Sequence, residues 1–255
     1  MLTAITRALS PAIVDCELSF LERQPIDFAL AVRQHAAYED ALRALGTRVI
    51  SLPCLPSHPD CVFVEDPAIV LDEVAIMTRM GAESRRGESE SLAAELGKYR
   101  ELRWIEAPAC LEGGDVIRVG KTLYVGLSRR TNVAGIQQLA GLVQPFGYWV
   151  TPIEVRGCLH LKSACCYLGD DTLLANRQFL DTDGLCGLNI IDVATSEPHA
   201  ANALRIAGTV LIPESYGETR ERVGSAGFQV RAVDTSELIK AEAGVTCCSL
   251  VFEAD

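Results

Sequence analysis

Several features are scarce or absent in this 255-residue sequence: it has four histidines, no Cys-x-x-Cys pair, no long apolar run and no long polar or Pro/Ser-rich stretch. Without Cys-x-x-Cys pairs, a structural zinc site is not expected. Without an apolar run near the roughly 18 residues of a membrane span, no transmembrane helix is expected. The start, Met1 to Arg7, is too short and too polar for a signal peptide. We therefore expect a soluble protein in the cytoplasm.

Basic residues are also few relative to acidic ones. The 34 acidic and 23 basic residues give a net charge of −11. This balance argues against nucleic acid and anionic membranes as partners, and it suits a cationic small-molecule substrate. Because 49% of the residues are hydrophobic and no linker divides the chain, we expect one α/β domain over residues 1–255. The oligomeric state stays open, with a homodimer among the alternatives.

Cysteine is the abundant reactive residue, with ten copies. Two pairs are adjacent, Cys165-Cys166 and Cys247-Cys248, a spacing that suits disulfides poorly, and a chain of this length does not need them. Cys247 lies between Gly244 and a β-prone stretch, and a thiol there is a candidate nucleophile if a base or a positive charge lowers its pKa. The alternative is a buried core cysteine, which we expect of Cys248 on the opposite face of the same strand.

Helices, strands and hairpins recur in one order with a period of about 50 residues. Residues 29–45 have apolar side chains at helical spacing, with Asp27 as the N-cap, and a short strand follows at 48–52. Five such units predict a cyclic, propeller-like α/β array with its helices outside; an open doubly wound sheet is the alternative. The predicted hairpins turn at 72–73, 120–121, 169–171 and 207–208. The other predicted helices lie at 88–97, 131–145, 218–225 and 236–242, with a weaker helix in the fourth unit. A last strand over 245–252 is predicted to pair with residues 2–7.

The unusual polar residues fall at one phase of this repeat, in the loop that enters each hairpin or on its first strand. Rotation about a central axis would bring them into one pocket. His160 is the best candidate base, because His35 lies on a predicted helix and His58 and His199 lie in polar loops; a structural, hydrogen-bonded histidine is the alternative. The residues at this phase are Asp60, Glu65, Asp66, Glu112, His160 and Cys247.

Carboxylates beside an apolar strand need a positive partner. Glu65 and Asp66 directly follow Val62-Phe63-Val64, and burying an unpaired charge is costly. A guanidinium group would supply the partner, because its planar fork binds carboxylates through two hydrogen bonds. The same fork makes the adjacent pairs Arg85-Arg86 and Arg129-Arg130 candidates for binding a substrate carboxylate, although most exposed arginines only solubilise the protein.

With these residues in place, the sequence resembles the dimethylarginine dimethylaminohydrolase family, within the guanidino-modifying (pentein, amidinotransferase-fold) superfamily. The resemblance implies a five-bladed, pseudo-fivefold α/β propeller of ββαβ units around a central active site, which agrees with the repeat count. The stretches that carry it run in order along nearly the whole chain: 59–67 (PDCVFVEDP), 81–88 (GAESRRGE), 111–115 (LEGGD), 128–132 (SRRTN), 160–163 (HLKS) and 244–250 (GVTCCSL).

The resemblance also implies a role for each matching position. Three residues would carry the chemistry, with Cys247 as the nucleophile, His160 as the general acid and base, and Glu112 as the carboxylate that supports it. The remaining matches would bind substrate: Asp60, Glu65 and Asp66 line the guanidinium pocket, Arg85 and Arg130 hold the substrate carboxylate, and the main-chain carbonyls of Leu18 and Ala241 hold the α-amino group.

The activity implied by the resemblance is hydrolysis of Nω-methylated L-arginine to L-citrulline and methylamine or dimethylamine through a covalent thiouronium intermediate, with no metal or organic cofactor. Zinc could still inhibit by bridging Cys247 and His160. Related arginine deiminases usually carry an aspartate two residues after the histidine, where this sequence has Lys162, which favours an alkylated substrate. Two alternatives stay open: hydrolysis of arginine or another guanidino compound, and a non-catalytic protein that binds cationic amino acids.

Overall fold

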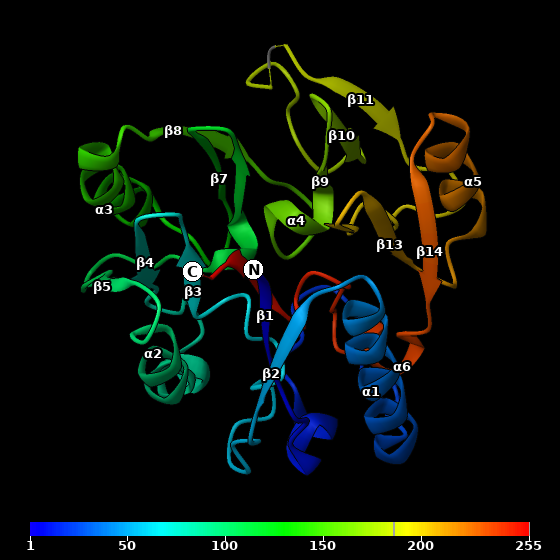
Figure 1. Ribbon diagram of the computed structural model, residues 1–255, viewed down its shortest axis with the longest axis horizontal. Coiled ribbons are helices and arrows are strands. Elements are labelled where there is room, and N and C mark those ends of the chain that lie inside the picture. Colours follow the sequence, from blue (N-terminus) through cyan, green and yellow to red (C-terminus); the bar gives the residue numbers. More distant parts are fainter. Residues whose placement is uncertain (186, 255) are drawn as a thin grey trace.

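Five three-stranded sheets surround a central axis, as Figure 1 shows. The computed structural model describes residues 1–185 and 187–254. The sheets are β15-β1-β2 (Leu250–Glu253, Leu2–Arg7, Arg48–Leu52), β3-β4-β5 (Ala68–Val70, Val74–Met77, Glu101–Trp104), β6-β7-β8 (Val116–Val119, Thr122–Leu127, Trp149–Glu154), β9-β10-β11 (Cys165–Gly169, Thr172–Ala175, Asn189–Asp192) and β12-β13-β14 (Leu204–Ile206, Thr209–Pro213, Gln229–Val233). In each sheet, two strands pair antiparallel and a third joins them in parallel; in four of the sheets the antiparallel pair is a hairpin, and in the fifth it is β1 with β15.

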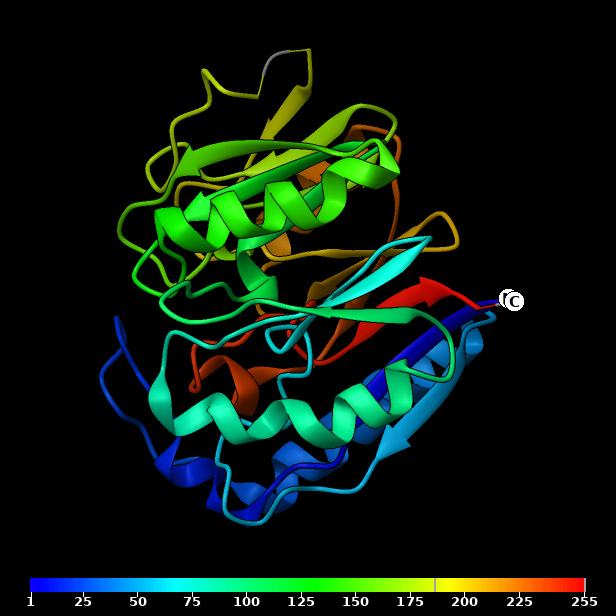
Figure 2. The same cartoon turned by 90° about the vertical axis from the view of Figure 1, so that its left-hand side faces the viewer.

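Helices connect the second and third strands of four sheets, as parallel pairing of those strands requires a crossover. Figure 2 shows α2 and α3 in front of the strands, on the outside of the ring. In the described part of the chain no helix is long and apolar enough to cross a membrane. The crossing helices are α1 (Phe28–Ala44), α2 (Ser89–Leu96), α3 (Val133–Val143) and α5 (Gly217–Ser225); the shorter ones are α4 (Leu161–Ala164), α6 (Ser236–Ile239) and the 3₁₀ turns η1 (Pro11–Asp15), η2 (Glu83–Glu88), η3 (Gly113–Asp115) and η4 (Gln144–Phe146).

Local sequence signals fix most of these boundaries. The Asp27 carboxylate accepts the Leu30 N–H at 2.9 Å and begins α1, as an N-cap residue does. The hairpin between β9 and β10 turns at Asp170 and Asp171, whose φ angles are +51° and +50°, a conformation that aspartate tolerates in turns. The predicted helices at 29–45, 88–97, 131–145 and 218–225 and all four predicted hairpin turns are therefore confirmed.

The ring closes within one sheet. Strand β1 pairs in parallel with β2 and antiparallel with β15, with Leu2 opposite Glu253. The two ends of the chain consequently lie side by side in Figure 1. This closure confirms the predicted pairing of the last strand with residues 2–7, and it rules out the open doubly wound sheet.

Apolar side chains fill the spaces between each sheet and its helix. Leu139 and Val143 of α3, for example, pack in one buried cluster with Leu123 and Val125 of β7. Each fully buried leucine or valine contributes about 1.5–3 kcal/mol. This packing builds the rigid frame that carries the loops at the centre of the ring.

Three local predictions are wrong. The connection from β10 to β11 contains no helix in its described residues, 176–185 and 187–188. His160 does not open a strand but precedes the single turn α4, because the Asp115 carboxylate accepts the Leu161 N–H at 2.8 Å. Cys247 lies in a turn before β15, because the Asn202 side chain accepts the Thr246 N–H at 3.0 Å and holds this backbone away from a strand.

Candidate active site

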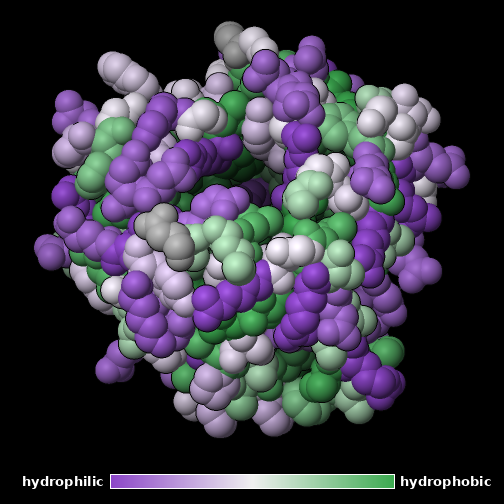
Figure 3. Space-filling model, in the orientation of Figure 1, coloured by the Kyte–Doolittle hydropathy of each residue, from purple (hydrophilic) through white to green (hydrophobic). Residues whose placement is uncertain are grey.

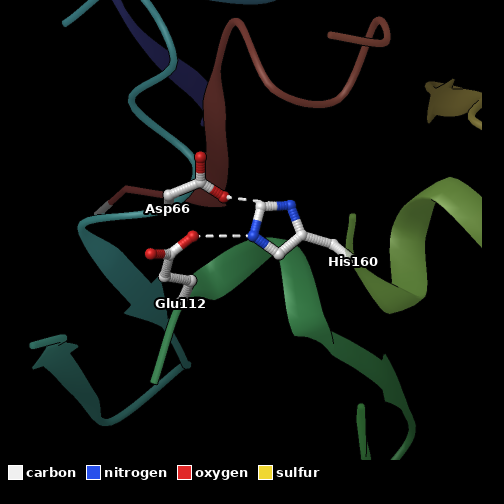
Figure 4. A group of neighbouring side chains, drawn as sticks. All are labelled: Asp66, Glu112 and His160. Atoms are coloured by element: carbon white, nitrogen blue, oxygen red, sulfur yellow. Dashed lines mark hydrogen bonds and ion pairs between the residues drawn. The ribbon is translucent and has the colours of Figure 1, made fainter. Parts of the chain in front are cut away.

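His160 and two carboxylates form the buried centre of the site. The His160 Nε2 atom lies 2.7 Å from Glu112 Oε2, and its Nδ1 atom lies 3.9 Å from Asp66 Oδ1. Figure 4 shows the three side chains pointing toward one another from separate segments of the chain. The turn η3 permits this approach, because a Cβ on Gly114 would lie 2.8 Å from His160 Nδ1. Only glycine leaves that space free.

The ionisation of this pair follows from its surroundings. Burial alone lowers the pKa of His160, but the charge of Asp66 and the hydrogen bond with Glu112 outweigh it and raise the pKa to about 9. Burial alone raises the pKa of Glu112, but the hydrogen bond from His160 and nearby positive charges outweigh it and lower the pKa to about 2. At neutral pH the pair is an imidazolium beside a carboxylate, so Nδ1 also carries a proton, and it lies 3.9 Å from Asp66 Oδ1.

This ion pair should make stability depend on pH in a defined window. Because the folded pKa of Glu112 lies below 4.5, its contribution is present above pH 4.5 and is lost as the pH falls toward 2. Because the folded pKa of His160 lies above 6.5, its contribution is full below pH 6.5 and is lost as the pH rises through 9. We expect the difference in melting temperature between the wild type and a Glu112→Gln/His160→Asn double variant to be largest between pH 4.5 and 6.5. A difference that stays constant from pH 6.5 to 9 would contradict this assignment.

Cys247 and His160 line the same small cavity. Asp60, Asp66, Arg85, Arg130 and the backbone around Ala241 complete most of its wall. Burial and the charges of Glu65 and Asp66 raise the pKa of the Cys247 thiol well above its ordinary value. The thiol is therefore protonated at neutral pH, and a cation bound between these carboxylates would favour its ionisation.

The predicted acids divide into two groups. Asp60 and Asp66 face the cavity, where Asp66 Oδ2 also lies 2.7 Å from Arg85 Nη1. Glu65 faces away: its two oxygens are bound by Lys162 Nζ at 2.6 Å and by Thr246 Oγ1 at 2.7 Å. Glu65 and Lys162 line a second cavity of about 420 Å³, which Figure 3 shows as a hollow near the middle of the face that carries both chain ends. The Lys162–Glu65 ion pair thus borders this second cavity and is not part of the lining of the active-site cavity.

The two predicted arginines differ in how many of their N–H donors already have a hydrogen-bond partner. Arg85 is buried and donates to Asp66, to both oxygens of Glu88 and to the Phe63 carbonyl, so it mainly holds these groups in place. Arg130 is also buried, but within the described residues its Nη1 has no hydrogen-bond partner. An unsatisfied buried guanidinium donor is costly unless a ligand completes it. Arg130 is the better placed of the two to bind a substrate carboxylate.

Three ligand-type atoms, from Asp66, Glu112 and His160, lie within 4.8 Å of one another. Arg85 already pairs with Asp66, and Arg130 Nη1 lies 3.6 Å from Glu112 Oε1. The positive charges of these two guanidinium groups, so close to the three ligand-type atoms, would repel a divalent cation. The two carboxylates are better explained as groups that stabilise the protonated imidazole of His160.

Comparisons with known proteins show the family to which this chain belongs. Residues 19–181 match the family model described as N,N dimethylarginine dimethylhydrolase, eukaryotic. The chain is 37% identical over 250 residues to N(G),N(G)-dimethylarginine dimethylaminohydrolase of Pseudomonas aeruginosa, covering 97% of this chain and 98% of that one. The chain belongs to the dimethylarginine dimethylaminohydrolase family. A second member of the family, from Streptomyces coelicolor, is 36% identical over 97% of this chain and 95% of its own.

Solved structures of the dimethylarginine dimethylaminohydrolase family have the same fold. A cysteine-to-serine mutant of the Pseudomonas aeruginosa enzyme complexed with citrulline matches with a TM-score of 0.94 at 36% identity, covering 98% of both chains. The N-terminal domain of ArgZ, a cyanobacterial arginine dihydrolase, matches with a TM-score of 0.87 at 19% identity. These likenesses confirm the predicted five-bladed pentein propeller.

Sequence reasoning gave no role to several groups that support this site. Asp115 is buried and accepts hydrogen bonds from Leu161 N at 2.8 Å and Ser128 Oγ at 2.6 Å, which orients the segment that carries His160. Glu88 holds Arg85, and Glu242 borders the cavity. Glu88 and Glu242 are ordinary surface-type acids in the sequence. The one available signal was that Asp115 ends the LEGGD motif that begins with Leu111.

Proposed function

We propose that this protein hydrolyses Nω-methylated L-arginine to L-citrulline and methylamine or dimethylamine. The observation that carries the proposal is one cavity in which a thiol (Cys247) and a protonated imidazole (His160) meet two carboxylates, Asp60 and Asp66. Carboxylates suit a guanidinium group, and the unsatisfied Nη1 of Arg130 suits the carboxylate at the other end of an amino acid. The names of the two bacterial relatives support the same activity.

The reaction would proceed in two steps. Binding of the cationic substrate beside Asp66 favours release of the Cys247 proton to bulk water, and the thiolate attacks the central guanidinium carbon, forming a C–S bond. His160 gives its Nδ1 proton to the departing amine as the C–N bond breaks. Water then loses a proton to His160 and adds to the same carbon, and the C–S bond breaks to release citrulline.

The position of Lys162 supports a methylated rather than a free guanidinium. Arginine deiminases usually have an aspartate there as a second grip on the guanidinium, whereas Lys162 here turns its ammonium group to Glu65 on the far side of the active-site cavity. Carboxylates would then hold only one of the two terminal nitrogens of the guanidinium group, the one that carries no methyl group. This leaves room for methyl groups on the other nitrogen.

A panel of guanidino substrates tests this proposal. We expect kcat/KM for dimethylarginine and monomethylarginine to exceed that for arginine by about 10- to 100-fold, the range that small groups give in a fitted pocket. The measurement is release of amine compared with release of ammonia, with citrulline as the common product. A preference for arginine would favour the deiminase alternative, and tight binding without turnover under reducing conditions would favour the non-catalytic one.

Further parts of the proposal rest on the sequence. We assign the whole of residues 1–255 to one catalytic domain that acts without a metal or organic cofactor. A cytoplasmic location rests on the lack of a long apolar run in the sequence, and the expectation that neither nucleic acid nor a membrane is a partner rests on the net charge of −11. A homodimer stays among the alternatives for the assembly.

A further inference from the structure

The segment 16–27, between η1 and α1, borders the active-site cavity without forming a helix or strand. It extends from the body of the protein in dark blue at the left of Figure 2. Its Glu17 lines the cavity, and the Ser19 hydroxyl accepts a hydrogen bond from Arg130 Nη2 at 3.3 Å. The predicted α-amino ligand, the carbonyl of Leu18, lies between these two residues. How this segment is held therefore bears on how substrate is held.

Apolar packing alone holds the segment weakly. Phe20 and Leu21 close an apolar cavity of about 90 Å³ beside the active site, but 39% and 37% of their surfaces stay exposed. The stronger attachment is polar, and it uses the backbone of the segment. Carboxylates from other parts of the chain accept its N–H groups: Asp60 binds Glu17 N at 3.1 Å and Glu237 binds Asp27 N at 2.8 Å.

Glu242 makes the largest of these attachments. Its Oε1 atom accepts three successive N–H groups, those of Ser19 at 2.9 Å, Phe20 at 2.5 Å and Leu21 at 2.6 Å. Successive backbone N–H groups form a concave site for an anion, and hydrogen bonds to a charged acceptor are about twice as strong as neutral ones. Glu242 therefore makes the main hydrogen-bonded contact that holds the middle of the segment.

The backbone of Glu242 is strained. Its φ angle is +59°, in the left-handed region that glutamate seldom adopts. Such conformations persist where surrounding contacts require them and are frequent at functional sites. Here the strained residue lies directly after Ala241 and five residues before Cys247, so it joins the loop of the nucleophile to segment 16–27.

The hydrogen bonding of the Glu242 carboxylate is also incomplete within the described residues. All three N–H groups bind Oε1, whereas Oε2 is buried and, within the described residues, has no hydrogen-bond partner. A buried acceptor without a partner offsets part of what the three hydrogen bonds contribute. The net free energy with which Glu242 holds the segment in place is thus modest, which suits a segment beside which substrate enters and product leaves.

We propose that Glu242 is a positioning residue that fastens the backbone of residues 19–21 and thereby places the Leu18 carbonyl and the Ser19 hydroxyl beside Arg130. The inference rests on the proposed function insofar as it concerns substrate binding. Glu242 acts through the segment and contributes to holding the amino-acid end of the substrate. It does not take part in the bond-breaking steps.

The test compares Glu242→Ala and Glu242→Gln in the full chain with Glu22→Ala, which removes an exposed carboxylate from the same segment. In Glu242→Ala we expect KM for dimethylarginine to rise about tenfold while kcat changes by less than about twofold. In Glu242→Gln the amide oxygen still accepts the three N–H groups without charge, so KM should rise only about threefold. Glu22→Ala should leave both constants at the wild-type value.

A second readout needs no substrate. Hydrogen exchange at the amides of Phe20 and Leu21 should be about tenfold faster in Glu242→Ala than in the wild type or in Glu22→Ala. Unchanged exchange, or a fall in kcat with KM unchanged, would overturn the assignment of Glu242. If the wild type does not hydrolyse dimethylarginine, the proposed function fails while the exchange measurement still decides whether Glu242 fastens the segment. Should Glu242→Ala fail to fold, the same comparison is made with Glu242→Gln.

Discussion

Replacing Cys247 by serine is expected to lower kcat by at least about 10⁴-fold, because removing a nucleophile removes the whole covalent route. Burial and the charges of Glu65 and Asp66 already raise the pKa of the thiol, and a hydroxyl group, a far weaker acid, would not ionise in these surroundings. The fold should be retained, since serine is close in size to cysteine and the residue lies in a turn. Citrulline formation measures the loss, and intact mass spectrometry of quenched reactions tests for the covalent adduct.

The neighbouring thiol provides a matched control. Cys248 is 1% exposed and packs in the core cluster beside β1. Cys248→Ser should cost stability, about 1–3 kcal/mol for a buried hydroxyl that is poorly satisfied, and leave kcat within about tenfold of the wild type. Turnover by Cys247→Ser at the wild-type rate would end the proposed mechanism.

The second large effect is expected for His160→Asn. General acid and base catalysis contributes about 10² to 10⁴-fold, so kcat for dimethylarginine should fall by about 10³-fold. The imidazolium Nδ1 faces the cavity, and asparagine has no proton that it can transfer at neutral pH. Steady-state release of dimethylamine measures the effect.

The leaving group separates the two roles of His160. An analogue whose leaving group is a thiol, S-methyl-L-thiocitrulline, needs no proton to depart, so the first step should survive in His160→Asn while hydrolysis of the adduct remains slow. We expect a burst of one methanethiol per active site followed by slow turnover. Equal losses in the first step for the amine and thiol leaving groups would mean that His160 is not the acid.

Elements with local signals could be predicted from the sequence. Helix α1 has a 3.6-residue apolar period and an aspartate cap, and three of the four hairpins have a glycine at positive φ in the turn: Gly120, Gly169 and Gly208. The repeat of these elements was enough to predict the five-bladed ring. It was also enough to group Cys247, His160 and the acids around one axis.

The details of the site could not be predicted, because partners distant in sequence determine them. Asn202 holds the backbone of Thr246 and so keeps Cys247 out of β15. Lys162, 97 residues from Glu65, turns that carboxylate away from the active-site cavity. The different states of Arg85 and Arg130 likewise depend on Glu88 and on the segment at Ser19. No local pattern encodes such contacts.

The closure of the ring through β15 and β1 also sets an order of assembly during synthesis. Domains begin to fold while the chain is still emerging from the ribosome, but the first sheet is missing a strand until residues 250–253 have appeared. Cys247 precedes that strand by only three residues. The proposed nucleophile, Cys247, therefore enters the protein in the same late step that closes the ring, and a nascent chain with an open ring lacks the complete set of proposed reactive groups.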